Sequence, residues 1–256
     1  ALWPDVNVTE ASPPRAVSLA RRTLDAGGLG NAIRSYVRHG YRFAIDEASL
    51  GQAAPSIPTE DSDLEAARAL AKARNWKRAA EAFERIDARD GLDAFDIDLW
   101  ALVVECGGRP AAAIPILTRA VSAHAEAGNS SRAARAAVTL AKVNLECGAP
   151  AVASGWIERA EALLDGAGDA EATAYLLWMK SRLATIGGQP ERALDLASTA
   201  YSLAENKNDP GLQALTLAYK GFYNLSLGHI DEGTGQQNHA AAIALSSQVD
   251  PITGSL

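Results

Sequence analysis

Glycines recur at a constant interval of 40 residues in the second half of the chain, at Gly108, Gly148, Gly188 and Gly228. Their surroundings repeat as well, because the segment 147–150, Cys-Gly-Ala-Pro, is echoed by the segment 187–190, Gly-Gly-Gln-Pro. Each glycine stands between two apolar patterns of helical period, which is typical of the tight turn in a two-helix hairpin. An interval of this length predicts an array of helical hairpins.

The composition agrees with close-packed helices. Of the 256 residues, 48% are hydrophobic, which is enough for a sizeable core, but only 6% are aromatic. Alanine, the strongest helix former, dominates stretches such as 132–137. No apolar run approaches the roughly 18 residues of a membrane span, and no signal-peptide pattern is present at the N-terminus. We therefore expect a soluble, cytoplasmic chain without a membrane partner.

Charge divides the chain into two parts. The formal net charge is −7, whereas residues 1–48 contain six arginines and five acidic residues, a balance of +1 that leaves −8 for the remainder. An acidic region repels the phosphates of nucleic acids and anionic membrane surfaces. Any contact with nucleic acid is therefore expected from the first 48 residues.

The first 48 residues have the pattern of a helix followed by a β-hairpin. Ser12 and the two prolines after it suit a helix start, and the helix is expected to run to Leu24. A glycine-rich turn over 25–31 ends it. The segment 33–45 then alternates β-forming residues around His39 and Gly40, which predicts a hairpin.

This order of elements, ending in Gly-Tyr-Arg-Phe at 40–43, resembles the C-terminal half of the OmpR/PhoB-type winged-helix domain of bacterial transcriptional regulators. The resemblance implies that the helix enters the major groove of promoter DNA and that the hairpin forms the wing. The remaining half of such a domain would precede Ala1, so we expect a fragment of a longer regulator or a remnant docked on the repeats. The implied DNA-binding residues are Arg15, Arg21, Arg22, Arg38 and His39. A solvated helix face is the alternative interpretation of each single arginine.

A linker is predicted after this half-domain. Residues 49–62 lack periodicity and contain Pro55 and Pro58. We therefore predict a partial winged helix over 1–48, a linker over 49–62 and repeats over 63–256.

The repeats keep small residues in a fixed register relative to the glycines. With each glycine at position 15 of a motif of about 34 residues, small residues fall at positions 8, 20 and 27. The twelve positions are Ala101, Ala113, Ala120, Ala141, Ala153, Ala160, Ser181, Ala193, Ala200, Gly221, Gly233 and Ala240. This register resembles the tetratricopeptide repeat (TPR), in which these positions are helix contacts.

An earlier copy has Arg74 at the turn and Trp76, Ala79 and Phe83 at helix-contact positions, which makes five copies. The predicted fold is therefore all-α, a TPR-like solenoid of helical hairpins, with a small N-terminal partial winged helix consisting of a helix and a β-hairpin. Residues 249–256 resemble the start of a further first helix, so we expect that the array is truncated at its C-terminus.

The resemblance also implies a binding groove, because the first helix of each repeat lines the concave face of such arrays. The implied groove residues are Asp98, Glu105, Arg135, Thr139, Lys142, Glu146, Trp178, Arg182, Tyr219 and Phe222. Core packing is an equally good interpretation of Trp178 and Phe222. Charged residues such as Lys142 and Arg182 are more often solvated than engaged in binding. An aromatic ring beside a cation suits an extended peptide with an acidic or carboxylate group.

The sequence contains none of the common catalytic motifs. Walker-type phosphate loops, GxGxxG, GxSxG and HExxH do not occur. The acidic group Asp93, Asp96 and Asp98 suits a helix start and a solvated face better than acid–base catalysis. The two cysteines and four histidines lack the spacing of metal ligands. We expect no enzyme, no metal and no cofactor.

These observations lead to one principal hypothesis and its alternatives. The chain would be part of a transcriptional regulator that binds promoter DNA through its completed winged helix and a peptide, a protein or a second copy of itself through the repeats. The alternative is a TPR interaction scaffold, or the sensor module of a larger signalling protein, that does not bind DNA. A catalytic domain such as a nucleotide cyclase, outside these residues, is a third alternative.

Overall fold

The computed structural model describes Val17, Arg21 and residues 33–36, 40–43, 60–207 and 209–246. The chain divides into two compact units, Ala1–Ile57 and Pro58–Leu256. The first helix of the second unit begins at Glu60, inside the segment 49–62 for which a linker was predicted. The segment 249–256, with its predicted additional helix, lies outside the described residues.

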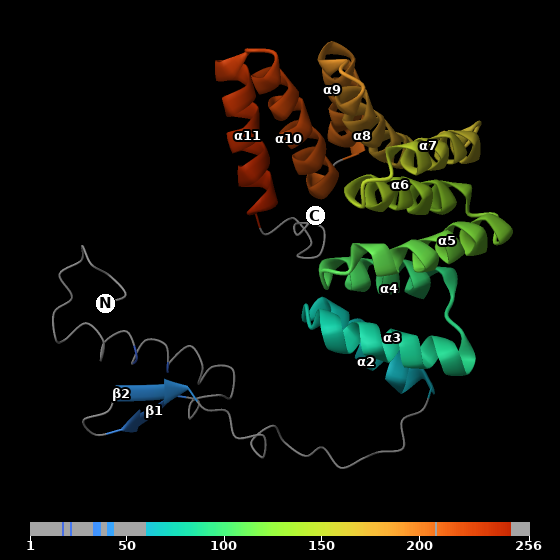
Figure 1. The fold of residues 1–256 in the computed structure, drawn as a ribbon, viewed down its shortest axis with the longest axis vertical. Coiled ribbons are helices and arrows are strands. Elements are labelled where there is room, and N and C mark those ends of the chain that lie inside the picture. Colours follow the sequence, from blue (N-terminus) through green and yellow to red (C-terminus); the bar gives the residue numbers. More distant parts are fainter. Residues whose placement is uncertain are drawn as a thin grey trace. The chain divides into compact units, whose positions relative to one another are not determined.

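The first unit contains a β-hairpin, as predicted for residues 33–45. Strands β1 (Ile33–Tyr36) and β2 (Gly40–Phe43) pair antiparallel, with Ile33 opposite Phe43 and Tyr36 opposite Gly40 (Figure 1). Val17 and Arg21 have helical backbone. The Nε and Nη2 atoms of Arg21 donate hydrogen bonds of 3.1 and 2.8 Å to the carbonyl oxygen of Ile33. Arg21 thus joins the helical segment to the hairpin.

The second unit is a stack of helical hairpins (Figure 1). Ten helices over residues 60–244 form five antiparallel pairs, and successive pairs pack on one another. The pairs are α2 (Glu60–Lys72) with α3 (Trp76–Asp90), α4 (Ala94–Cys106) with α5 (Pro110–Glu126), α6 (Ser130–Glu146) with α7 (Pro150–Leu164), α8 (Ala170–Ile186) with α9 (Pro190–Lys207), and α10 (Pro210–Ser226) with α11 (Ile230–Ala244). The predicted TPR-like solenoid of five hairpins is confirmed.

The periodic glycines close each hairpin in the left-handed backbone region. Their φ angles are 77°, 79°, 70° and 87° at Gly108, Gly148, Gly188 and Gly228. In the turn after α6, the amide of Gly148 donates to the carbonyl of Leu145 at 3.0 Å, and that of Ala149 donates to Asn144 at 2.9 Å. These two bonds satisfy carbonyls that the helix end leaves open. Arg74 takes the equivalent place after α2 with a φ of 57°.

All twelve small residues of the predicted register are buried. We call these twelve positions the small-residue seam, because they lie where helices approach one another. In the last hairpin, a Cβ atom on Gly233 would lie 2.8 Å from the carbonyl oxygen of Gly221 and 2.9 Å from the amide nitrogen of Leu225. Only glycine fits there without a shift of the backbone.

The acidic residues at the start of α4 differ from the prediction in one respect. Asp93 caps the helix as expected, since its carboxylate accepts a hydrogen bond of 2.8 Å from the amide of Asp96. The prediction of a solvated face is wrong for Asp96, which is buried. Its carboxylate accepts bonds of 2.8 and 2.7 Å from the guanidinium of Arg68 in α2. The pair therefore links the first two hairpins.

Candidate partner-binding groove

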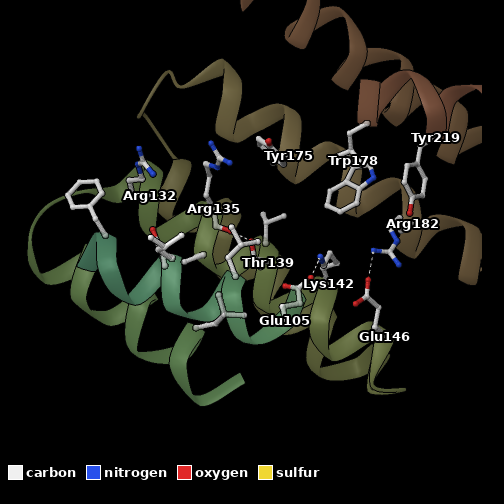
Figure 2. A pocket seen from close by; sticks show the side chains of 18 residues that line it. Glu105, Arg132, Arg135, Thr139, Lys142, Glu146, Tyr175, Trp178, Arg182 and Tyr219 are labelled. Atoms are coloured by element: carbon white, nitrogen blue, oxygen red, sulfur yellow. Dashed lines mark hydrogen bonds and ion pairs between the residues drawn. The ribbon is translucent and has the colours of Figure 1, made fainter. Parts of the chain in front are cut away.

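A cavity of about 400 Å³ lies along the first helices α4, α6, α8 and α10 (Figure 2). Nine of the ten residues that the sequence assigned to a groove line it. They are Asp98, Glu105, Arg135, Thr139, Lys142, Glu146, Trp178, Arg182 and Tyr219. The tenth, Phe222, is not part of the lining; it is 48% exposed on α10, and its ring centroid lies 5.4 Å from that of Tyr223.

The cavity also contains polar and aromatic residues that sequence reasoning missed, namely Phe95, Arg132 and Tyr175. A signal for two of them was present. Shifting Arg135 by the repeat interval of 40 residues gives Phe95 in one direction, and Tyr175 and then Leu215 in the other. All four positions line the cavity. The glycine period therefore identifies lining residues as well as turns.

An ion pair between neighbouring first helices occupies the middle of the groove. The Nζ atom of Lys142 on α6 donates to Oε1 of Glu105 on α4 (Figure 2). The two side chains are only 12% and 11% exposed. The interpretation of Lys142 as a solvated charge is therefore wrong. The pair links two neighbouring repeats.

Arg135 connects α6 to α8. Its guanidinium pairs with Glu171 and lies 4.2 Å from the ring centroid of Tyr175, a distance suited to cation–π attraction. Burial raises the pKa of the Tyr175 hydroxyl above its ordinary value, and the charge of Arg135 opposes that shift. The phenol is therefore a neutral hydrogen-bonding group at physiological pH.

Two aromatic rings flank Arg182 at the α8–α10 end of the groove. Its guanidinium carbon lies 5.5 Å from the ring centroid of Trp178 and 5.8 Å from that of Tyr219, and the two rings meet edge to face at 5.6 Å (Figure 2). Nη1 of Arg182 is 3.6 Å from Oε1 of Glu146, which is beyond hydrogen-bond distance. This pair is looser than that of Lys142.

Trp178 belongs to the core and to the groove at once. It is only 6% exposed and packs in the main hydrophobic cluster, yet it lines the cavity. Its indole nitrogen Nε1 is buried and finds no hydrogen-bond partner among the described residues. A buried donor without a partner is unfavourable by roughly 1–3 kcal/mol, so such donors call for an explanation.

A buried histidine, His124, lies behind the lining at the opposite end of the groove. Nε2 of His124 on α5 lies 2.8 Å from Oδ2 of Asp98, and the His124 ring meets Phe95 edge to face. Burial raises the pKa of the Asp98 carboxyl, while the bond to His124 and the charges of Arg132 and Arg135 act in the opposite direction. The guanidinium carbon of Arg132 lies 5.2 Å from the ring centroid of Phe95.

Of the residues implied in DNA binding, only Arg21 is described. Arg15, Arg22, Arg38 and His39 lie outside the described residues. A search of the described part of the chain finds no group of three or more His, Cys, Asp or Glu residues that could hold a metal ion. In the same part, no helix has the length and apolar character needed to span a membrane.

Comparison with solved structures establishes that the array has a TPR-like fold. BtubC (BKLC) from P. vanneervenii superposes with a TM-score of 0.55 at 17% identity, over 91% of this chain and 88% of that one. A single-residue variant of the nearly identical TPR-like repeats of a candidate kinesin light chain from Podosopora anserina gives 0.52 at 16% identity, over 72% and 93%. No protein-family model and no curated protein matches the sequence.

Proposed function

We propose that the array is a protein-interaction scaffold whose groove binds an extended peptide segment through an acidic side chain or a terminal carboxylate. The observation that carries the proposal is the alternation of cations and aromatic rings along one cavity, with Arg135 against Tyr175 and Arg182 between Trp178 and Tyr219. Rings give a peptide apolar contact area, and guanidinium groups bind carboxylates with well-defined geometry. Solenoids of this class use their concave surfaces for binding.

Arg182 is the cation best suited to receive the ligand's carboxylate. Glu146 holds it at 3.6 Å only and is itself partly exposed, so an incoming carboxylate can replace this partner while Glu146 turns to water. Lys142, in contrast, is fixed to Glu105 in a nearly buried pair.

The proposal is tested with two fluorescent pools of randomised peptides, one rich in Asp and Glu and the other containing Asn and Gln at the same positions. Fluorescence polarisation should show binding of the acidic pool alone. Arg182→Ala should weaken it by at least about tenfold, because charge-assisted hydrogen bonds contribute about 1.5–3 kcal/mol. Arg159→Ala is the matched control, since Arg159 is exposed on α7 outside the groove lining. Equal binding of both pools would contradict the proposal.

We propose as a second candidate that the first unit takes part in DNA binding within a transcriptional regulator. The observation that favours it is the bond from Arg21 to Ile33, because it joins a helical segment to a hairpin ending in Gly-Tyr-Arg-Phe. The alternative is a scaffold without DNA binding. Titration of duplex promoter fragments across a salt series is the test. DNA contact predicts binding that weakens steeply with salt and is lost in the double variant Arg15→Ala/Arg22→Ala. Binding that is absent or insensitive to salt would favour a scaffold that does not bind DNA.

A further inference from the structure

Glu146 on α6 and Arg182 on α8 form an ion pair, and the equivalent positions one repeat later are apolar. Glu146 stands two residues before Gly148, and Arg182 stands six residues before Gly188. The same register one repeat on, counted from Gly188 and Gly228, gives Ile186 and Phe222. An acid–base pair is thus replaced by two apolar side chains.

Both apolar side chains are accessible, with Ile186 60% and Phe222 48% exposed. Each lies about one helical turn beyond a lining residue, because Ile186 follows Arg182 by four residues on α8 and Phe222 follows Tyr219 by three on α10. Arg182 and Tyr219 line the cavity and face each other at its end (Figure 2). Beside Arg182, the polar lining is therefore followed by an apolar patch of Ile186 and Phe222, which we call the apolar step.

We infer that an apolar side chain of the bound peptide packs on Ile186 and Phe222, next to the carboxylate held by Arg182. The inference rests on the proposed function. It adds an anchoring site for one side chain of the peptide and the direction in which the peptide lies. The peptide's acidic group lies at Arg182 on α8, and its apolar residue lies about one helical turn farther along, on Ile186 of α8 and Phe222 of α10. Aromatic and aliphatic surface of this kind is what anchors a peptide side chain in a groove.

A peptide fits this step better than a second copy of the chain does. Two side chains offer far less area than the roughly 1,200 Å² that stable protein interfaces bury in total. Residues 49–256 carry a balance of −8, so two copies of the array repel one another, whereas the step adjoins the cation of Arg182. One side chain of a peptide covers Ile186 and Phe222 while its neighbouring carboxylate binds the guanidinium.

The test uses synthetic nine-residue peptides of Gly and Ser that contain one Glu, with either Leu or Ser placed at increasing distance on one side of it. The full chain should bind the Leu peptide about tenfold more tightly than the Ser peptide at one particular spacing, as expected for one apolar side chain in a matching site. Ile186→Ser and Phe222→Ser should each remove this gain and leave the dependence on Glu intact. Ile230→Ser is the matched control, because Ile230 is 58% exposed at the start of α11, outside the groove lining.

The outcomes separate the inference from the proposed function. Glu-dependent binding without a Leu gain, or a Leu gain that survives both serine variants, overturns the inference alone. Failure of every peptide to bind overturns both. Concentration-dependent self-association that Phe222→Ser abolishes, seen by analytical ultracentrifugation, overturns it in favour of a second copy. Unchanged circular dichroism melting curves of the variants confirm that they are folded.

Discussion

The small-residue seam and the groove use the same 40-residue period in opposite ways. The seam has Ala, Gly or Ser at each of its twelve positions, all of them buried. The position six residues before each turn glycine differs in all four of these repeats: Leu102, Lys142 and Arg182 line the cavity, and Phe222 lies one repeat beyond its end. Helix contact restricts a position to small residues, since the backbones approach closely there. A position that faces the cavity is free to vary, so differences between repeats identify the surface available for recognition.

The ion pair between Lys142 and Glu105 is expected to be structural, as the seam is. Its disruption should have the largest effect on stability. Lys142→Met leaves the carboxylate of Glu105 nearly buried and unpaired, so we expect the free energy of unfolding to fall by about 3 kcal/mol. The double variant Lys142→Met/Glu105→Leu should recover to within about 1 kcal/mol of the native chain, because it leaves no buried charge. Urea unfolding followed by circular dichroism measures both.

Arg182→Ala provides the contrast within the groove. Its ion pair is loose and partly exposed, so its loss should change the free energy of unfolding by less than about 1 kcal/mol. Equal effects of Lys142→Met and Arg182→Ala would show that the groove is uniformly structural, and the distinction between groove and seam would then fail.

The seam itself is tested in the last hairpin, where Gly233 approaches Gly221. An alanine Cβ at position 233 would press on backbone atoms of Gly221 and Leu225, so Gly233→Ala should lower the free energy of unfolding by about 2 kcal/mol, even though alanine favours helix. Gly235→Ala is the matched control, because it lies in the same helix with no atom within 4 Å of its added Cβ. It should raise stability by up to about 1 kcal/mol. Thermal melts of the pair that shift in the same direction would contradict this account of the seam.

The seam could be predicted from sequence, whereas the contacts within the groove could not. Turn glycines and small residues repeat in a fixed register because backbone geometry demands them, so one sequence reveals the hairpins. The pairing of Lys142 with Glu105 depends on side-chain conformations of residues 37 positions apart, and that of Asp96 with Arg68 crosses two hairpins. Hydropathy patterns do not identify such partners. Phe95 and Tyr175 were recoverable, since they share the 40-residue spacing of Arg135.

The smallest expected effect concerns Asp98, a partly buried groove residue whose carboxyl is sensitive to pH. Burial raises the pKa of its carboxyl in the folded chain. At pH values between the unfolded pKa of about 3.9 and the folded pKa, the folded chain therefore binds more protons than the unfolded one. The contribution of Asp98 to stability therefore grows as the pH falls through the folded pKa and is lost as the pH rises. Asp98→Asn removes the titration but retains an oxygen acceptor for His124.

On acidification from neutral pH, the unfolding free energy of the native chain should accordingly rise relative to that of Asp98→Asn. Asp195→Asn, which changes an exposed aspartate on α9, controls for the altered net charge. Parallel pH profiles for the native chain and Asp98→Asn would show that water reaches Asp98 as freely as it reaches an exposed groove residue. A profile that diverges only for Asp98→Asn would place this end of the groove with the buried scaffold and leave the Arg182 end as its open part.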